Sequence, residues 1–375
     1  MKITDISTYL NEAYERLSDD DIKLSSDLRN IVDFGKSITS DTTFDDTFHS
    51  KLSNLIAKIT KTTIHESTIN TPVPHVFTDS VGYNSAIEHI LIDVPDFVAN
   101  ETYLYDTNTF EKLFGEEMPE ISATYYNSVL HCTNKITKSK QMYIDAFSSE
   151  SAFNAYWSEV LNRIKVRVEY AKAVLSYAVF NSKIAHSMHK NNKENVVALS
   201  IPNDNDYTNF ITTLKTTIRT IKDFNNFGGD GYVDSTPSDH LHLAILGDYF
   251  DKMTTSKAYA FNDKFLDIPV NNIEVLNNFG DSSDKDVIRV VTPDNTEGNE
   301  TKLENVVAVL YDDRGAVAYG DNIYTDSQKI ANTAGKINFF YMYDFHRAVV
   351  DGYKCVIFTK NGSTDVTLNS PIENE

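Results

Sequence analysis

Two histidines and an aspartate stand close together in the middle of the chain and could begin a metal site. Asp239, His240 and His242 surround the start of an apolar run, Leu241–Leu246, which is typical of a β-strand. On a strand, His240 and His242 would point to the same side, as two ligands of one zinc ion must. A strand that carries two partly exposed histidines is the commoner case, and we expect it here in place of a metal ion.

Three other groups of residues could also suggest a binding site, and each has a structural explanation. His186 and His189 stand three residues apart near the end of a predicted helix, where cationic side chains interact favourably with the helix dipole. Asp312 and Asp313 are typical of a turn bounded by acidic residues. The segment GGDG at 228–231 lacks the GK[ST] ending of a phosphate-binding loop. GxSxG, HExxH and CxxC motifs are absent from the sequence. We therefore expect no catalytic residue, no cofactor and no metal ion.

The bulk composition narrows the class of protein. The 375 residues include 54 acidic and 34 basic side chains, which give a net charge of −20. Phosphate affinity comes from clustered Lys and Arg, so the surface as a whole is unsuited to nucleic acid. Two cysteines, Cys132 and Cys355, cannot form a disulfide framework and suit a reducing compartment. The N-terminus has no apolar run typical of a signal peptide, and no stretch of 18 apolar residues predicts a membrane span.

A long helix is the clearest structural prediction. Residues 120–201 contain neither glycine nor proline, and Pro202 follows directly. Within them, apolar side chains recur at intervals of three and four residues, which predicts one helix over about residues 153–189. The side chains expected to be buried are Phe153, Trp157, Leu161, Ile164, Val168 and Leu175. A helix of this length in a mixed α/β protein would act as a spine for other elements.

A β-hairpin is predicted before this helix. Its arms would be residues 75–81 and 86–94, joined near residues 82–84. The apolar side chains with little local core to cover them are Phe77, Val81, Tyr83, Ile87, Ile90 and Ile92. After the spine, residues 207–224 predict a helix, and residues 281–305 predict a polar loop.

Several of these segments, taken in order, resemble the major capsid proteins of tailed bacteriophages, particularly the short-tailed, podovirus-like phages. The resemblance covers about residues 44–360. It is carried by FDDTFHSKLSNLIAKITKTTI, FTDSVGYNSAIEHILIDV, ITKSKQMYIDAF, VVAVLYDDRGAVAYGDNIYT and INFFYMYDFHRAVVDGYKCVIFTK, and by the strand–helix–strand pattern of residues 239–280.

The resemblance implies an α+β fold, the shell-protein fold that tailed phages share with herpesviruses. Its parts would be an N-terminal arm with short helices (1–65), an extended β-hairpin loop region (66–118), a peripheral domain with the spine helix (119–202), an axial domain (203–335), and closing strands of the peripheral domain with a C-terminal tail (336–375).

The resemblance also implies a function. A major capsid protein is structural and not an enzyme: it assembles into the hexamers and pentamers of an icosahedral head around double-stranded DNA. Its location would be the virion, after assembly in the host cytoplasm. Partners would be copies of itself and, in addition, scaffolding, portal and decoration proteins. Two alternatives stay open, another phage structural protein such as a tail tube or sheath, and an enzyme of unrecognised α/β fold.

One charge feature bears on DNA. Residues 135–193 carry ten basic and four acidic side chains within an acidic protein. A solvated helix face would explain them. The alternative is that Arg163, Lys165, Arg167 and Lys172 face the interior of the shell and meet packaged DNA through non-specific phosphate contacts. Some shell proteins of this fold are cross-linked between a Lys and an Asn, and we predict no such pair here.

Overall fold

The computed structural model describes the parts of the chain that form its helices, strands and the shorter connections between them. The described residues are 25, 29–33, 36, 71–78, 87–92, 121–126, 128–190, 194–201, 207–225, 227–229, 234–255, 268–280, 283–291, 300–329, 336–360 and 366–368.

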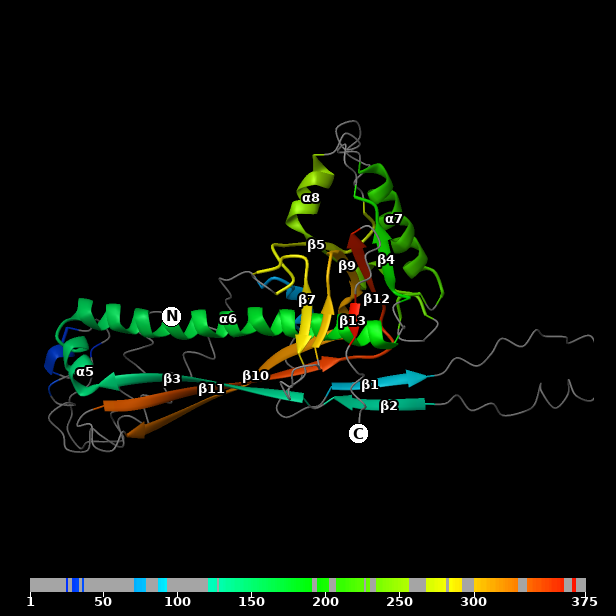
Figure 1. Ribbon diagram of the computed structural model, residues 1–375. Coiled ribbons are helices and arrows are strands. Elements are labelled where there is room, and N and C mark those ends of the chain that lie inside the picture. Colours follow the sequence, from blue (N-terminus) through cyan, green and yellow to red (C-terminus); the bar gives the residue numbers. More distant parts are fainter. Residues whose placement is uncertain are drawn as a thin grey trace, which may run out of the picture.

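Helix α6, Glu150–Lys190, runs through the middle of the molecule (Figure 1). Its 41 residues span roughly 60 Å at 1.5 Å per residue. A short helix, α5 (Lys140–Ala146), precedes it. The hydroxyl of Ser149 accepts a hydrogen bond from the Ala152 nitrogen at 3.2 Å and so caps the first turn of α6. The helix includes all of residues 153–189, the range that the apolar periodicity predicts, and extends a few residues beyond it at its start.

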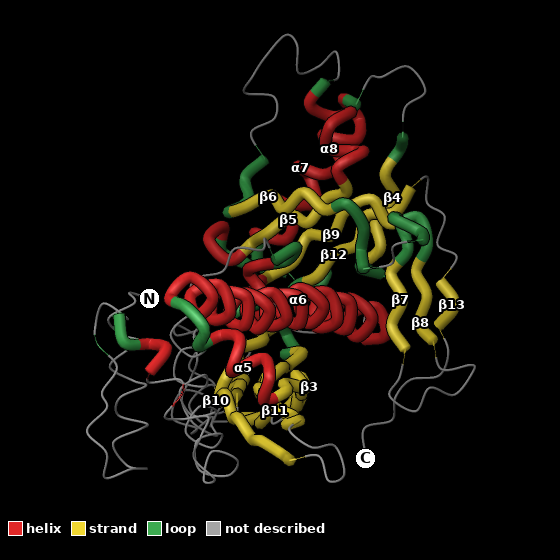
Figure 2. The backbone as a smooth tube through the Cα atoms, turned by 90° about the vertical axis from the view of Figure 1, so that its left-hand side faces the viewer, coloured by secondary structure: helices red, strands yellow, loops and turns green. Residues whose placement is uncertain are grey.

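A long antiparallel sheet lies along one side of α6 (Figures 1 and 2). Its strands, in spatial order, are β10 (Ala316–Lys329), β11 (Lys336–Val349) and β3 (Ser128–Ser139). Strands β10 and β11 form a hairpin, and β3 pairs with the free edge of β11 over twelve residues. Because Tyr343 and Phe345 of β11 belong to the same apolar core as Val168 and Leu175 of α6, helix and sheet are packed together.

A five-stranded mixed sheet lies on the other side of α6 (Figure 2). Its order is β4 (Val196–Leu199), β12 (Cys355–Lys360), β9 (Val306–Asp312), β5 (Leu241–Leu246) and β6 (Asn272–Leu276). Alternate residues of β5 face opposite sides: Ala244 joins the core shared with α6, whereas Leu243 packs with α7 (Thr208–Lys222). Both faces of β5 are therefore covered, and all six of its residues are buried.

Smaller elements complete the described structure. Strands β7 (Ile288–Val291), β8 (Glu300–Leu303) and β13 (Val366–Leu368) form a three-stranded sheet, and β1 (Ile87–Ile92) pairs with β2 (Ile121–Tyr126). The short helices are η2 (Pro74–Val76), η3 (Ser238–His240), α8 (Gly247–Thr254) and η5 (Asp313–Gly315).

One sequence-based expectation needs correction. Residues 281–305 are not simply a loop, because they contain β7 and β8; their polar composition hid the short strands. Strand β12 lies in the five-stranded sheet between β4 and β9. The chain after residue 336 therefore contributes β11 to the long sheet and β12 to the five-stranded sheet. Within the ranges that the structure describes, no helix is both long and apolar enough to cross a membrane.

Candidate functional site

The two-stranded ladder of β1 and β2 extends away from the two larger sheets (Figure 1). The strands are antiparallel, with registers running from Ile87 opposite Tyr126 to Ile92 opposite Ile121. The ladder contains no third described strand. A two-stranded hairpin on its own is marginally stable in water, so this projection needs support from another surface.

The side chains of the ladder leave apolar area exposed. Ile90 is 53% exposed and Tyr125 is 65% exposed. The Tyr125 hydroxyl donates a hydrogen bond to Glu88 Oε1, directly across the ladder, at 2.8 Å. Pairs of this kind hold the two strands in register. The remaining apolar surface is available to a partner.

The hairpin is built differently from the sequence-based prediction. Strand β1 pairs with β2, which begins 29 residues after β1 ends, and not with the described residues 75–78. Residues 74–76 form η2, and Phe77 bridges to Ala318 of β10. Ile87, Ile90 and Ile92 do belong to β1. Val81 and Tyr83 lie outside the described residues. The register of a two-stranded ladder depends on long-range pairing, which local alternation does not specify.

The root of the hairpin is fixed to the body of the protein. Val76, beside the root, is fully buried. The rings of His89 and Tyr353 have centroids 5.2 Å apart, and the Tyr126 hydroxyl accepts a hydrogen bond from the Asp351 nitrogen at 3.4 Å. A cavity of about 560 Å³ opens at this junction, lined by Pro74, His75, Phe77, Thr78, Ile87, Glu88, His89, His240, Asp313, Arg314, Val317, Val350 and Tyr353.

The spine helix buries one face and exposes another. Phe153, Val168 and Leu175 are buried, as the sequence predicts. The side chains of Trp157, Leu161 and Ile164 lie outside those that the structure describes. On the opposite face, Val166, Tyr170 and Val174 are 44%, 64% and 50% exposed. Their spacing of four residues places them in one stripe along the helix, which we call the apolar stripe.

The basic side chains of the spine have different environments. Arg163 and Arg167 are exposed, and Arg163 forms an ion pair with Glu159 one turn earlier. Lys172 is half-buried, and burial lowers the pKa of its ammonium group. The Lys165 side chain lies outside those described. Lys183, another member of the basic segment, is buried and faces the protein interior.

His240 and His242, the two histidines considered as metal ligands from the sequence, differ in their exposure to solvent. His240 ends η3 and is 43% exposed on its side chain, whereas His242 is completely buried. The expectation of two partly exposed histidines is wrong for His242, because both faces of β5 are covered. Asp313 joins the two: its Oδ1 lies 2.9 Å from His240 Nδ1, and its Oδ2 lies 3.3 Å from His242 Nε2. Burial alone would raise the pKa of the Asp313 carboxyl. The hydrogen bonds from His242 and His240 outweigh burial and lower this pKa below its ordinary value.

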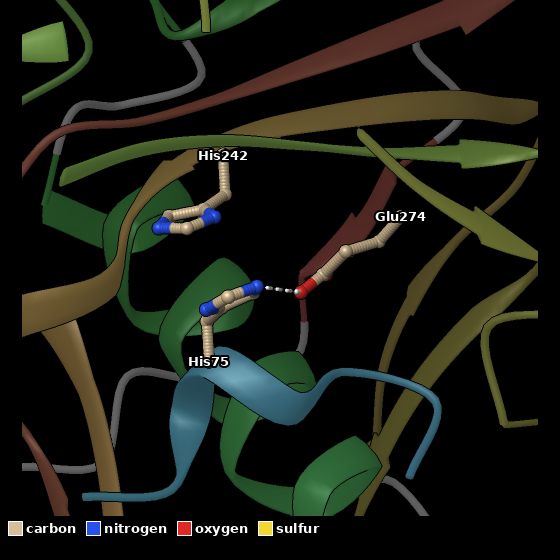
Figure 3. Close-up of side chains that lie close together, drawn as sticks. All are labelled: His75, His242 and Glu274. Carbon is tan, nitrogen blue, oxygen red and sulfur yellow. Dashed lines mark ion pairs between the residues drawn. The ribbon is translucent and has the colours of Figure 1, made fainter. Parts of the chain in front are cut away.

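One described group of side chains could ligate a metal ion. His75 of η2, His242 of β5 and Glu274 of β6 each offer one ligand atom, and these atoms lie within 4.8 Å of one another (Figure 3). Burial raises the pKa of Glu274 to about 7, although the hydrogen bond from the Tyr311 hydroxyl opposes this shift. His75 and Glu274 could not be paired from the sequence, since about 200 residues separate them. Two features of the sequence point toward this group. One is the strand–helix–strand pattern of residues 239–280, and the other is Glu274 within an apolar strand.

The other polar groups have structural roles. His186 pairs with Asp351, at the turn after β11, and His189 Nε2 lies 3.3 Å from the Thr301 hydroxyl. Asp312 is buried and makes a two-pronged contact with Arg314 at 2.9 and 2.6 Å. Among the described residues, none of these groups has the arrangement of a catalytic triad or phosphate-binding loop.

Comparison with known proteins gives a consistent result. A family model described as "Phi29-like phage major capsid protein" matches residues 8–359. No curated protein matches the chain. The capsid structure of Staphylococcus phage Andhra aligns with a TM-score of 0.54 at 11% identity, over 79% of this chain and 86% of that one. This degree of similarity shows a shared fold.

Two further capsid structures align less well. The cyanophage P-SCSP1u capsid gives a TM-score of 0.47 at 9% identity, over 77% of this chain and 87% of that one. The mature capsid of bacteriophage PhiM1 gives 0.45 at 10% identity, over 79% and 89%. Their scores are too low to add to the fold assignment.

Proposed function

Because the chain belongs to the family of Phi29-like phage major capsid proteins, we propose that it builds the hexamers and pentamers of an icosahedral head around double-stranded DNA. Its role is that of a structural protein of the virion. The observation that carries the proposal is the β1–β2 hairpin, which is anchored at its root and exposes apolar side chains beyond it.

The hairpin is suited to bind a neighbouring subunit. Its root is held by contacts to Tyr353 and Asp351, so its position relative to the body is defined. Ile90 and Tyr125 are apolar and exposed, and burying them against a second copy would stabilise the assembly. Contacts between different patches on identical subunits generate closed rings, as five- and six-membered capsomers require.

The apolar stripe of the spine helix is the surface that this hairpin would cover. Val166, Tyr170 and Val174 present apolar area on an otherwise polar helix face. An aromatic residue on each side, Tyr125 on the hairpin and Tyr170 on the helix, fits the usual composition of interface centres. We infer that the hairpin of one subunit lies across α6 of the next.

The basic side chains support contact with DNA. Arg163 and Arg167 are exposed on α6. Lys172, further along the same helix, is half-buried. Arg163 and Arg167 share the helix face of the apolar stripe, so, together with Lys165 and Lys172, they would line the interior of the shell and offset part of the phosphate charge where the neighbouring hairpin does not cover α6. Such contacts carry no sequence information, which suits a container for any genome. Lys183 is excluded from this lining because it is buried.

The remaining partners are inferred from the family alone. Scaffolding, portal and decoration proteins would contact the assembled shell, and assembly would take place in the host cytoplasm. A tail tube or sheath is disfavoured, since the family and the Andhra structure are both of capsid proteins.

Electron microscopy of particles carrying hairpin variants tests the proposal. The double variant Ile90→Ser, Tyr125→Ser removes the exposed apolar side chains without touching the core. We expect a soluble, folded subunit that fails to form stable closed shells. The matched control is Phe224→Ser, which removes a 70% exposed aromatic residue elsewhere and should leave assembly unchanged. Normal shells from the double variant, or tubes from the wild type, would refute the proposal.

A further inference from the structure

The side chains of His75, His242 and Glu274 come from three separate elements and lie close together (Figure 3). His242 and Glu274 project from the adjacent parallel strands β5 and β6, on the sheet face that also carries Tyr311. His75 approaches from η2, and its ring stacks on that of His242 with centroids 4.1 Å apart.

Two of these side chains have a buried polar atom with no hydrogen-bond partner in the described part of the chain. They are Nδ1 of His242 and Oε1 of Glu274. His242 is completely buried, and Glu274 is 7% exposed. Leaving such atoms without a partner is costly, so a cation between them would resolve an otherwise unfavourable arrangement.

The hydrogen bonds around the group fix which nitrogen atoms carry lone pairs. Asp313 accepts a hydrogen bond from His242 at Nε2, so in the neutral ring Nδ1 bears the lone pair. The Asn272 amide nitrogen, which is a donor, lies 2.8 Å from His75 Nε2, so that atom is an acceptor as well. A metal ion would take the place of the Asn272 contact. One nitrogen of each histidine and one carboxylate oxygen of Glu274 then lie within 4.8 Å of one another.

The distances are close to those of a metal centre. His75 Nε2 lies 3.8 Å from Glu274 Oε1. Ligands about 2.0–2.2 Å from a tetrahedral zinc ion are separated by about 3.3–3.6 Å. The ligand atoms, now up to 4.8 Å apart, would move closer, and the stacked rings of His75 and His242 would turn toward the ion, when the site is filled. The outer contacts are also typical, because a ligating histidine usually donates its second N–H to a carboxylate, as His242 does to Asp313.

We propose that His75, His242 and Glu274 bind a divalent zinc-type ion, with water from the adjacent cavity as the fourth ligand. His75 is 30% exposed on its side chain and lines that cavity, which gives the ion an entry path. The ion would join η2, at the start of the hairpin region, to the middle of the five-stranded sheet. All three ligands belong to one subunit, so the site is independent of assembly.

Zinc binding by the full-length chain, freed of metal with a chelator and held at pH 8, tests the site. We expect one zinc ion per chain, measured by competition with a chromophoric chelator, and a higher melting temperature in zinc. His75→Ala and Glu274→Gln should each weaken binding by about 100-fold or more and abolish the zinc-dependent shift. Asp313→Asn, which disturbs only the outer contact, should weaken it by about 10–100-fold.

The matched control is His131→Ala, because His131 is an exposed histidine that pairs with Asp344 in the long sheet. It should bind zinc as the wild type does. Glu274→Gln keeps the shape of the side chain and an acceptor for Tyr311, so loss of zinc without loss of folding is measurable in at least this variant. Absence of stoichiometric zinc binding by the wild type, or unchanged binding in both His75→Ala and Glu274→Gln, would overturn the proposal.

Discussion

Lys183 Nζ, carried by the spine helix, donates a hydrogen bond to the main-chain oxygen of Val350 at 2.9 Å. Lys183 is 1% exposed, and Val350 lies just after β11, in the turn that also contacts the hairpin root. The spine is therefore joined to the end of the long sheet at Val350, and the hairpin root is joined to the next residue, Asp351. This relationship explains how a projecting hairpin keeps a defined direction.

Replacing Lys183 by methionine tests that contact. Methionine has a similar length but no donor, so the Val350 oxygen loses this partner inside the protein. We expect Lys183→Met to lower the free energy of unfolding by about 1–3 kcal/mol, measured by urea denaturation of the subunit. Lys135→Met, at an exposed position of β3, is the control and should change it by less than about 0.5 kcal/mol. Equal effects of the two substitutions would contradict the role of Lys183.

The pair of His186 and Asp351 predicts a response to acid. The hydrogen bond from His186 holds the pKa of Asp351 below its ordinary value, against the opposing effect of burial. A lowered folded-state pKa contributes stability above the unfolded-state value of about 4, and this contribution is lost as the pH falls through the folded-state value.

Asp351→Asn should therefore destabilise the subunit by about 1 kcal/mol at neutral pH, and the difference from wild type should shrink below about pH 4. Denaturation curves at pH 7 and pH 3 measure it. Asp248→Asn, at an exposed residue that pairs with Lys285, is the control and should show little difference at either pH. A difference for Asp351→Asn that stays constant across this range would be inconsistent with the pairing.

The elements that position the site were predictable to different degrees. The spine helix and strand β5 follow from strong local patterns, since one has unbroken helical periodicity and the other is a buried apolar run. The partner of β1 was not predictable in this way, because β2 lies beyond residues 93–120 in the sequence. His75 and Glu274 meet only when η2 packs on β6, and nothing in local composition brings them together.

Tyr170 tests the surface expected to receive the hairpin. Because Tyr170 is 64% exposed, Tyr170→Ser should change the free energy of unfolding of the isolated subunit by less than about 0.5 kcal/mol. Assembled shells should nevertheless dissociate at lower denaturant concentration, as light scattering can show. Phe224→Ser again serves as the control. Shells of wild-type stability from Tyr170→Ser would exclude this part of the apolar stripe from the interface.

Arg163 and Arg167 test the contact with DNA. The double variant Arg163→Gln, Arg167→Gln removes two exposed positive charges from α6, so each subunit should hold phosphate less strongly. We expect shells to form normally but DNA-filled heads to release their DNA at lower temperature. Arg219→Gln with Lys222→Gln on α7 is the charge-matched control. Equal DNA release from the α6 variant and wild type would argue against a lumen-lining spine.

A cryo-electron microscopy map of the assembled head would show how the subunits meet. We expect rings of five and six subunits in which β1 and β2 of one subunit cross α6 of its neighbour, with Tyr125 and Tyr170 both buried between them. A map in which the hairpin contacts only its own subunit, or leaves Tyr125 exposed to solvent, would contradict it.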